Sequence, residues 1–259
     1  MKKIWLTSFK STDRELLRQT YNHLKNYVNI DGFICDYDID IITWNTIKEG
    51  LIDKEISLWA VIMNSEDLNN FLFNYNISTL ILAVQQKKGL NFPIIFIQTD
   101  HKKISKDHLP TPFLGIEIIK LSVTDPSAKI LYKINSSSKK IKTDYYIDVY
   151  QIPHIGQWFE IGPINNIWKS GSLMGVCGAQ ILFQGVGSRG SLPKKSKLKS
   201  PIEGAEITWA NEKFIIWSVQ NEITPKDSHF LKIEGRPHTT IFGPTTNENE
   251  IDMYVIKLK

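Results

Sequence analysis

The chain changes character near its middle, and this change constrains the fold more than any other feature. Residues 1–125 alternate short apolar runs with helix-like segments, whereas residues 144–259 read almost entirely as strands and turns. Alternating strands and helices are typical of α/β proteins, and dense short strands are typical of all-β domains. We therefore expect a doubly wound parallel sheet followed by an antiparallel β-sandwich or barrel domain.

Apolar runs in the first half predict the strands of the parallel sheet, at 4–9, 32–36, 58–63, 92–98 and 114–121. The run 58–63 is nearly continuous in apolar residues, as expected when helices cover both faces of a sheet. Helices are predicted after a start at Ser11-Thr12-Asp13, over 46–51, and over 69–88 with Gly89 as the terminating residue.

The second half carries nine predicted strands separated by turn residues, many of them glycine. They cover 145–151, 158–161, 173–176, 179–184, 206–209, 214–220, 230–234, 239–242 and 251–258. Residues 210–213 are expected to form a hairpin turn between two strands that each carry a tryptophan.

The domain boundary is expected at about residue 126. The segment 135–143 is polar and rich in Ser and Lys, which is typical of a linker. However, the runs 129–134 and 145–150 could also pair as strands across it, in which case the β-rich domain begins near residue 128. We therefore divide the chain into an α/β domain, 1–126, and a β-rich domain, 127–259.

The composition favours a cytoplasmic protein. The two cysteines, Cys35 and Cys177, lie in different halves and within strand-like runs, so a disulfide framework is not expected. No stretch has the apolar length needed to span a bilayer. The net charge of +4 permits an anionic partner, such as a nucleotide or a polyanion, but does not require one.

The layout of the first half resembles that of a TIR domain. Residues 4–9 and the acidic segment after them are similar to the opening strand and loop of that family, and 61–65 (VIMNS) to its third strand and terminal serine. Residues 93–97 (PIIFI) resemble its fourth strand, which often begins with proline. The resemblance implies a flavodoxin-like fold, self-association and, as in many bacterial proteins of this kind, a role in defence. A flavodoxin-like or receiver-like domain without any TIR relationship is the alternative.

The sequence departs from the family at its catalytic position. Enzymatic TIR domains cleave NAD with a glutamate on the helix before the proline-led strand, but the corresponding run 80–84 (LILAV) contains no acid. We therefore expect Leu80 to pack into the core and leave no NAD pocket. Glu49 and Glu66 remain as candidate catalytic residues for a different NAD- or nucleotide-processing enzyme. Their simpler interpretation, shared with Asp53, Glu55 and Asp67, is a solvated face and helix caps.

A glycine-rich segment in the second half spells G-x-G-x-x-G over 185–190. A dinucleotide-binding loop must open a helix, whereas SLPKK follows here, so this function is not expected. Exposed backbone N–H groups and cations could still bind an anion, and the candidates are Gly185, Gly187, Arg189, Lys194 and Lys195. The alternative is a mobile, solvated hairpin loop.

The remaining reactive residue types predict little chemistry. A nucleophilic pair of Cys177 with His229 or His238 is conceivable, but the cysteine lies in a strand-like run rather than at a helix start. The six histidines lack metal-ligand spacing, so neither a metal site nor a cofactor is predicted.

Three classes of function follow from these observations. The first, which we favour, is a signalling or interaction protein in which a TIR-like module without the usual glutamate is joined to a β-rich recognition domain. Its partner would be a second copy or another protein. The second is the NAD- or nucleotide-processing enzyme. The third is a ligand-binding or toxin component, whose candidate stacking residues are Trp158, Trp168, Trp209 and Trp217.

Overall fold

The structure is a computed structural model that describes residues 1–9, 12, 14–105, 109–121, 126–136, 142–245 and 253–259. The chain divides into two compact units, Met1–Ile141 and Lys142–Lys259, which we call the α/β unit and the β-rich unit. The first is built on a parallel sheet and the second on a separate antiparallel sheet. The fold class predicted from the sequence is therefore confirmed.

The α/β unit contains five parallel strands in the order β2-β1-β3-β4-β5. Their bounds are β1 Lys3–Phe9, β2 Asn29–Cys35, β3 Ile56–Met63, β4 Ile94–Gln98 and β5 Glu117–Lys120. The chain starts with β1, adds β2 on one side of it, and then adds β3, β4 and β5 in turn on the other side. This order makes the sheet doubly wound, with its topological switch point between β1 and β3.

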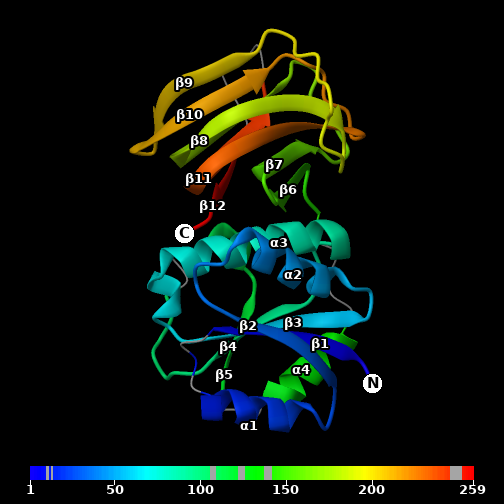
Figure 1. Ribbon diagram of the computed structural model, residues 1–259, viewed down its shortest axis with the longest axis vertical. Helices are drawn as coiled ribbons and strands as arrows, with labels where there is room; N and C mark the ends of the chain where they lie inside the picture. Colours follow the sequence, from blue (N-terminus) through cyan, green and yellow to red (C-terminus); the bar gives the residue numbers. More distant parts are fainter. Residues whose placement is uncertain (10–11, 13, 106–108, 122–125, 137–141, 246–252) are drawn as a thin grey trace. The chain divides into compact units, whose positions relative to one another are not determined.

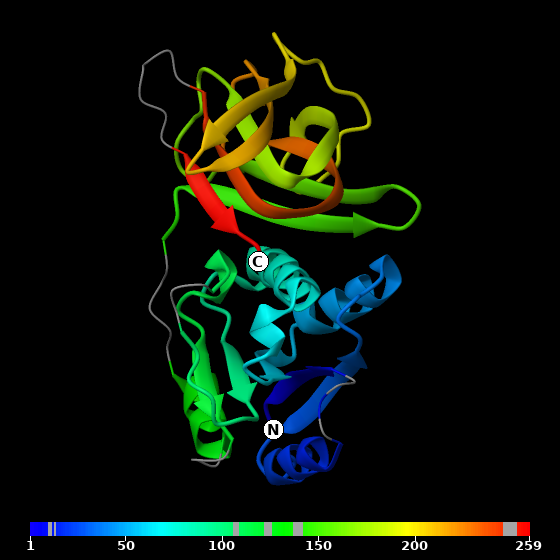
Figure 2. The same ribbon diagram turned by 90° about the vertical axis from the view of Figure 1, so that its left-hand side faces the viewer.

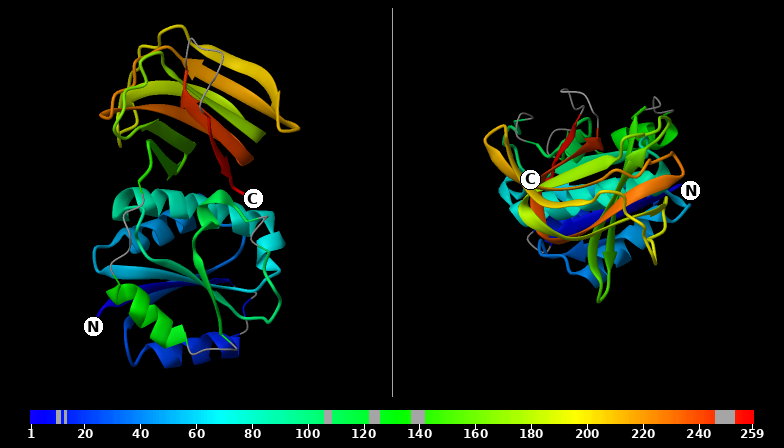
Figure 3. Two further views of the ribbon diagram at one scale, coloured as in Figure 1. Left: turned by 180° about the vertical axis from the view of Figure 1, so that it is seen from behind. Right: turned by 90° about the horizontal axis from the view of Figure 1, so that it is seen from above.

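Helices cover both faces of this sheet. They are α1 Arg14–Leu24, α2 Ile41–Ile52, α3 Phe71–Lys88 and α4 Pro126–Asn135, with short 3-10 turns η1 Asp67–Asn69 and η2 Thr111–Phe113. Figures 1 and 3 show α2 and α3 on one face and α1 and α4 on the other. The side chain of Asn70 caps α3 by accepting from the backbone N–H groups of Leu72 and Phe73, and Gly89 (φ 91°) ends it as predicted.

The core explains the apolar run of β3, in which every residue from Leu58 to Met63 is buried. Leu58, Ala60 and Ile62 belong to a cluster that also contains Leu24 and Ile130 from the helices on one face. On a strand, the intervening residues point to the opposite face. There the indole N–H of Trp59 donates to Thr7 Oγ1 at 3.0 Å, so the buried ring keeps a hydrogen-bond partner.

The predicted domain boundary was placed too early, because the division lies after residue 141 rather than near 126. The run 129–134, considered above as a strand, belongs to helix α4. Ile130 and Ile134 are both buried, and a spacing of four residues places them on one helix face. The linker predicted at 135–143 spans the division, although 137–141 lie outside the described residues, as do Ser11 and Asp13 of the predicted first helix start.

The β-rich unit contains seven strands in the order β6-β7-β11-β8-β10-β9, with β12 pairing to β11. Their bounds are β6 Tyr145–Ile152, β7 Gly156–Pro163, β8 Ser172–Ser188, β9 Ile202–Trp209, β10 Glu212–Val219, β11 Asp227–Pro244 and β12 Tyr254–Lys257. As predicted, β9 and β10 form a hairpin, and its turn residues Ala210 and Asn211 have φ values of 49° and 65°.

Two of these strands are much longer than predicted. Strand β8 joins the predicted strands 173–176 and 179–184, and β11 joins 230–234 and 239–242. The predicted interruptions are bends inside the strands. Gly178 and Gly235 have φ values of 77° and 90°, and the pairing of β8 with β11 shifts register after Gly235. Figure 2 shows the resulting curvature of the β-rich unit.

Candidate functional site

Polar side chains gather at the carboxyl edge of the parallel sheet. Tyr37 follows the end of β2, Ser65 and Asp67 follow β3, and Asp100 follows β4. In open α/β sheets, ligands bind in the crevice outside this edge, close to the topological switch point. The carboxyl edge is therefore the first candidate site.

Asp67 is the most buried carboxylate of this edge, with 4% of its surface exposed. Its Oδ1 accepts a hydrogen bond of 2.5 Å from the Tyr37 hydroxyl, and its Oδ2 accepts one of 2.8 Å from the Asn64 backbone N–H. Burial raises the pKa of the Asp67 carboxyl above its ordinary value, although both hydrogen bonds oppose this shift. A buried carboxyl with a perturbed pKa is a candidate for acid–base chemistry as well as a loop cap.

Asp100 lies in a different environment at the same edge. Its Oδ1 accepts hydrogen bonds from the Ser65 N–H at 3.1 Å and from Gln98 Nε2 at 2.7 Å, and its Oδ2 accepts one from the Ser65 hydroxyl. Burial by itself would raise the pKa of Asp100, but these hydrogen bonds outweigh it and lower the pKa. The pKa values of Asp67 and Asp100 are thus pushed in opposite directions, which is the pattern of a paired acid and base.

The two predicted catalytic acids are not brought together. Glu66 is exposed at the carboxyl edge, where it forms an ion pair of 2.6 Å with Lys102. Glu49 is exposed near the end of α2, the helix that leads back to the start of β3, and so lies toward the opposite edge. Sequence reasoning missed Tyr37 and Asp100. Their position directly after apolar strands was the signal that could have found them.

Helix α3, which precedes β4, contains no Asp or Glu along its 18 residues. Leu80 and Ile81 are fully buried, so the expectation that this part of the helix packs into the core is confirmed. This part of the helix therefore presents apolar side chains to the core. No side chain of α3 can therefore supply a carboxylate to a ligand.

The glycine-rich segment of the β-rich unit differs from the loop that the sequence predicted. Gly185 and Gly187 lie inside strand β8, opposite Phe230 and Ser228 of β11. A Cβ atom on Gly187 would lie 2.8 Å from the Cβ of Pro193. The glycines therefore let the following segment pack against the strand, and their backbone is not offered to an anion.

Arg189 and Gly190 bind groups of the protein itself. The Arg189 guanidinium lies 4.4 Å from the ring centre of Tyr146, and its Nη2 donates to the Pro163 carbonyl. The Gly190 N–H donates to Oε1 of the fully buried Glu160 at 2.7 Å. Arg189 is therefore engaged internally, whereas anion binding by the exposed Lys194 and Lys195 stays a prediction.

A second polar cluster lies inside the β-rich unit. His229 Nδ1 is 2.9 Å from Ser172 Oγ, and His229 Nε2 is 3.0 Å from Gln184 Oε1. All three residues are buried, and burial lowers the pKa of His229 to about 3. A substrate has no access to this serine and histidine. Cys177 lies opposite Thr239 on β11, so it does not form the nucleophilic pair with His229 that the sequence left open.

The tryptophans proposed as stacking residues are in different environments. Trp168 is buried, with 5% of its surface exposed, and belongs to the core. Trp209 is 47% exposed at the end of β9. The indole N–H of Trp158 is buried, and the ring lies 5.8 Å from that of Phe183 in an edge-to-face contact. The set therefore does not form one stacking platform.

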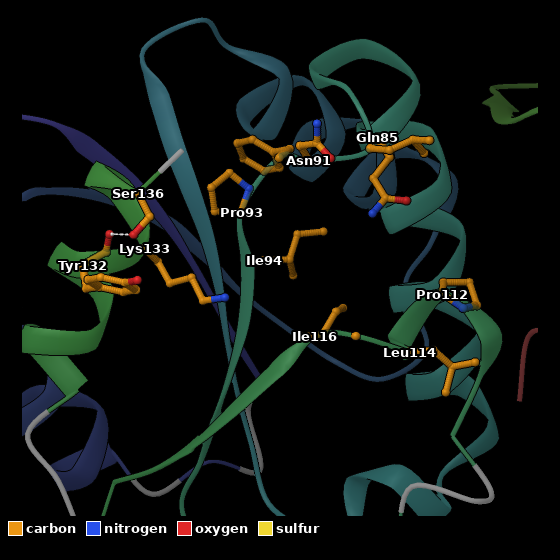
Figure 4. Close-up of a pocket in the computed structure, with 13 residues that line it drawn as sticks. Gln85, Asn91, Pro93, Ile94, Pro112, Leu114, Ile116, Tyr132, Lys133 and Ser136 are labelled. Atoms are coloured by element: carbon orange, nitrogen blue, oxygen red, sulfur yellow. Dashed lines mark hydrogen bonds between the residues drawn. The ribbon is translucent and has the colours of Figure 1, made fainter. Parts of the chain in front are cut away.

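A cavity of about 360 Å³ lies at the amino edge of the parallel sheet, where β4 and β5 begin. Its apolar wall comes from the two loops that enter these strands, and includes Pro93, Ile94, Pro112, Leu114 and Ile116. Figure 4 shows the side chains of Gln85 from α3 and Lys133 from α4 extending toward this space. The cavity thus combines an apolar wall with an amide and a cation, and it is distant from the acids of the carboxyl edge.

Comparisons with known proteins leave the chain without a family. No protein-family model matches it, and no curated protein matches it. Among solved structures, the lysine decarboxylase LdcF of Francisella novicida matches with a TM-score of 0.30 and 14% identity, over 51% of this chain and 17% of that chain. A similarity of this size carries no functional argument.

Two further observations concern the described part of the chain. No group of three or more His, Cys, Asp or Glu side chains within it is placed to hold a metal ion. None of its helices combines the length and the apolar character that crossing a bilayer requires.

Proposed function

We propose that the protein acts by binding other macromolecules, with a TIR-like α/β unit that works without the helix glutamate and a β-rich unit that serves in recognition. The observation that carries this proposal is the composition of α3, which has no carboxylate and buries Leu80 and Ile81 in the core. At the carboxyl edge, the hydrogen bonds of Asp67 and Asp100 tie neighbouring loops together. These hydrogen bonds would hold the loops in place equally well in a protein without catalytic activity.

The edge strand β9 supports a recognition role for the β-rich unit. All eight of its residues are exposed, and within the described part of the chain β10 is its one neighbouring strand. Three of its large apolar side chains, Ile202, Ile207 and Trp209, are 53%, 40% and 47% exposed. An open edge with exposed apolar residues favours pairing with a strand of another chain. We place the self-association expected of this protein at β9.

The proposal is tested by measuring the mass of the full chain in solution over a range of concentrations. Self-association should increase with concentration, and Ile207→Lys should weaken it. Ile42→Lys is the matched control, because Ile42 is also exposed but lies on α2 of the α/β unit. If I42K dissociates the assembly and I207K does not, the interface belongs to the α/β unit. A strictly monomeric wild type that captures no other protein chain contradicts the proposal.

One observation favours a second candidate, an enzyme acting on NAD or another nucleotide. The opposite pKa shifts of Asp67 and Asp100 at the carboxyl edge fit an acid–base pair, with Tyr37 hydrogen-bonded to the acid. Incubation of the full chain with NAD, at low and high protein concentration, separates the two functions. Release of nicotinamide that Asp67→Asn abolishes and Glu49→Ala leaves unchanged would establish the enzyme. No product under either condition agrees with the binding function.

A further inference from the structure

We infer that the cavity at the amino edge of the parallel sheet is a binding site for a small amphipathic monoanion, such as a medium-chain or aryl carboxylate. The cavity lies between the start of β4, the loop before β5 and the last turns of α3 and α4. Its volume of about 360 Å³ is in the lower part of the range of small-molecule sites. The site is independent of the proposed binding function, because it shares no residue with β9 or with the carboxyl edge.

The apolar wall of the cavity favours a ligand with an apolar body. Pro93 and Ile94 at the start of β4 face the space together with Pro112, Leu114 and Ile116 from the segment before β5. Leu114 is 59% exposed and so offers apolar surface that a ligand could cover. A hydrocarbon chain or an aromatic ring that covers this side chain would remove apolar surface from water, and this favours binding.

The charges of the side chains near the cavity favour a negatively charged ligand. Lys133 Nζ lies 3.2 Å from Oε2 of Glu117, and Lys129 Nζ lies 3.8 Å from Oε1 of the same carboxylate. Two ammonium groups thus share one carboxylate and leave one positive charge in excess. Lys133 lines the cavity, whereas Lys129, one helical turn earlier, does not. The net positive charge of this network therefore lies beside the cavity, and Lys133 is the member of the network that lines it.

The number of cations limits the charge of the ligand. Among the described residues that line this cavity, Lys133 is the one cation, and the Gln85 side chain also extends toward the space (Figure 4). A carboxylate can accept hydrogen bonds from the Lys133 ammonium. A phosphate monoester, which carries nearly two charges, would be neutralised only in part. The site therefore suits a monoanion.

The experiment uses the full chain and the fluorescent probe anilinonaphthalene sulfonate, an aromatic monoanion. The probe should bind, octanoate should displace it, and octanol should displace it at least about tenfold less well, because octanol lacks the charge. Lys133→Gln should weaken octanoate binding about tenfold, and Lys133→Arg should retain it. The Lys133 side chain is 37% exposed, so both variants at this position are expected to fold.

Two variants on the same ion-pair network make the test specific. Lys129→Gln is the matched control, because it removes an equal charge from the same carboxylate but lines no part of the cavity, and it should change binding less than about twofold. Glu117→Gln should tighten octanoate binding, because Lys133 loses its competing partner.

Equal weakening by K129Q and K133Q would show binding by diffuse surface charge and overturn the inference. Octanol competing as well as octanoate would also overturn it.

Discussion

The Tyr37 hydroxyl donates a 2.5 Å hydrogen bond to Oδ1 of Asp67 and so joins the segments that follow β2 and β3. The two residues lie thirty positions apart in the chain, and the parallel order of the strands brings them to one edge. The Tyr37 ring also stacks on Phe9, at 5.1 Å between ring centres, so the contact anchors the end of β1 as well. One aromatic side chain with a polar end therefore joins the ends of β1, β2 and β3.

Removing the hydroxyl tests this anchor. Tyr37→Phe should keep the stacking on Phe9 but cost the α/β unit about 1.5–3 kcal/mol, because Asp67 loses a hydrogen bond to a charged acceptor. The pKa of Asp67 should rise further, since that hydrogen bond now lowers it. Amide hydrogen exchange of β3 and α3 peptides measures the loss. Tyr27→Phe, at an exposed tyrosine of the same unit, should change stability by less than about 0.5 kcal/mol.

The stability of the β-rich unit should depend on pH through His229. Burial lowers its native pKa to about 3, whereas the unfolded chain titrates near the ordinary value of 6.5. Between these values the unfolded state binds a proton that the native state does not. The free energy of unfolding should therefore fall as the pH drops from about 6.5 toward 3, by up to about 1.4 kcal/mol per pH unit.

A pair of histidine variants isolates this contribution. His229→Gln removes the titrating group while leaving polar atoms near Ser172 and Gln184, and it should flatten the pH dependence of exchange in β8 and β11. His154→Asn is the control, because His154 is exposed in the turn after β6 and has a φ of 64° that asparagine tolerates. An unchanged slope in H229Q would assign the pH dependence to other groups.

The segment after β8 should detach when its internal carboxylate is removed. Glu160→Leu takes away the acceptor of the Gly190 N–H and of the Tyr150 hydroxyl while keeping a side chain of similar size. Tryptic cleavage in the exposed lysine-rich segment 194–199 should then become several-fold faster, because protease attack follows local opening. Glu222→Leu, at an exposed glutamate, should leave the cleavage rate unchanged.

The hairpin of β9 and β10 offers a prediction in which two similar substitutions have opposite effects. Ala210 has a φ of 49°, a conformation that is unfavourable for alanine and free for glycine, so Ala210→Gly should stabilise the hairpin by about 0.5–1 kcal/mol. Ala205→Gly lies within β9 of the same hairpin and should destabilise it by a similar amount, because glycine loses more entropy in a strand. Amide exchange of β10 reports both. Destabilisation by A210G would contradict the turn geometry.

Several features could be predicted from the sequence because they depend on local patterns. The continuous apolar run of β3 indicated a strand buried on both faces, and Gly89 indicated the end of α3. The turn at Ala210 and Asn211 followed from polar residues between two tryptophan-bearing strands. Each of these signals lies within about ten residues of the element that it predicts, so no long-range contact is needed to interpret it.

Helix α4 and the glycines of β8 show where local patterns were insufficient. The run 129–134 is short and only partly apolar, and such runs do not distinguish strand from helix until the sheet face that buries Ile130 and Ile134 is known. The spacing of Gly185 and Gly187 imitates a phosphate-binding loop, but its cause is the close approach of Pro193, which comes from beyond the strand. The cavity beside Lys133 could not be predicted either, because α4, which the sequence did not predict as a helix, forms one of its walls.

The sequence by itself therefore determined the two-part architecture, the parallel and antiparallel character of the two sheets, and the absence of an acid from α3. Only the tertiary structure decided that Tyr37 meets Asp67, that Gly190 binds Glu160, and that Lys133 faces a cavity. The physical reason is the range of the interactions. Backbone periodicity is a property of neighbouring residues, whereas hydrogen bonds and cavities depend on which distant segments the packed core brings into contact.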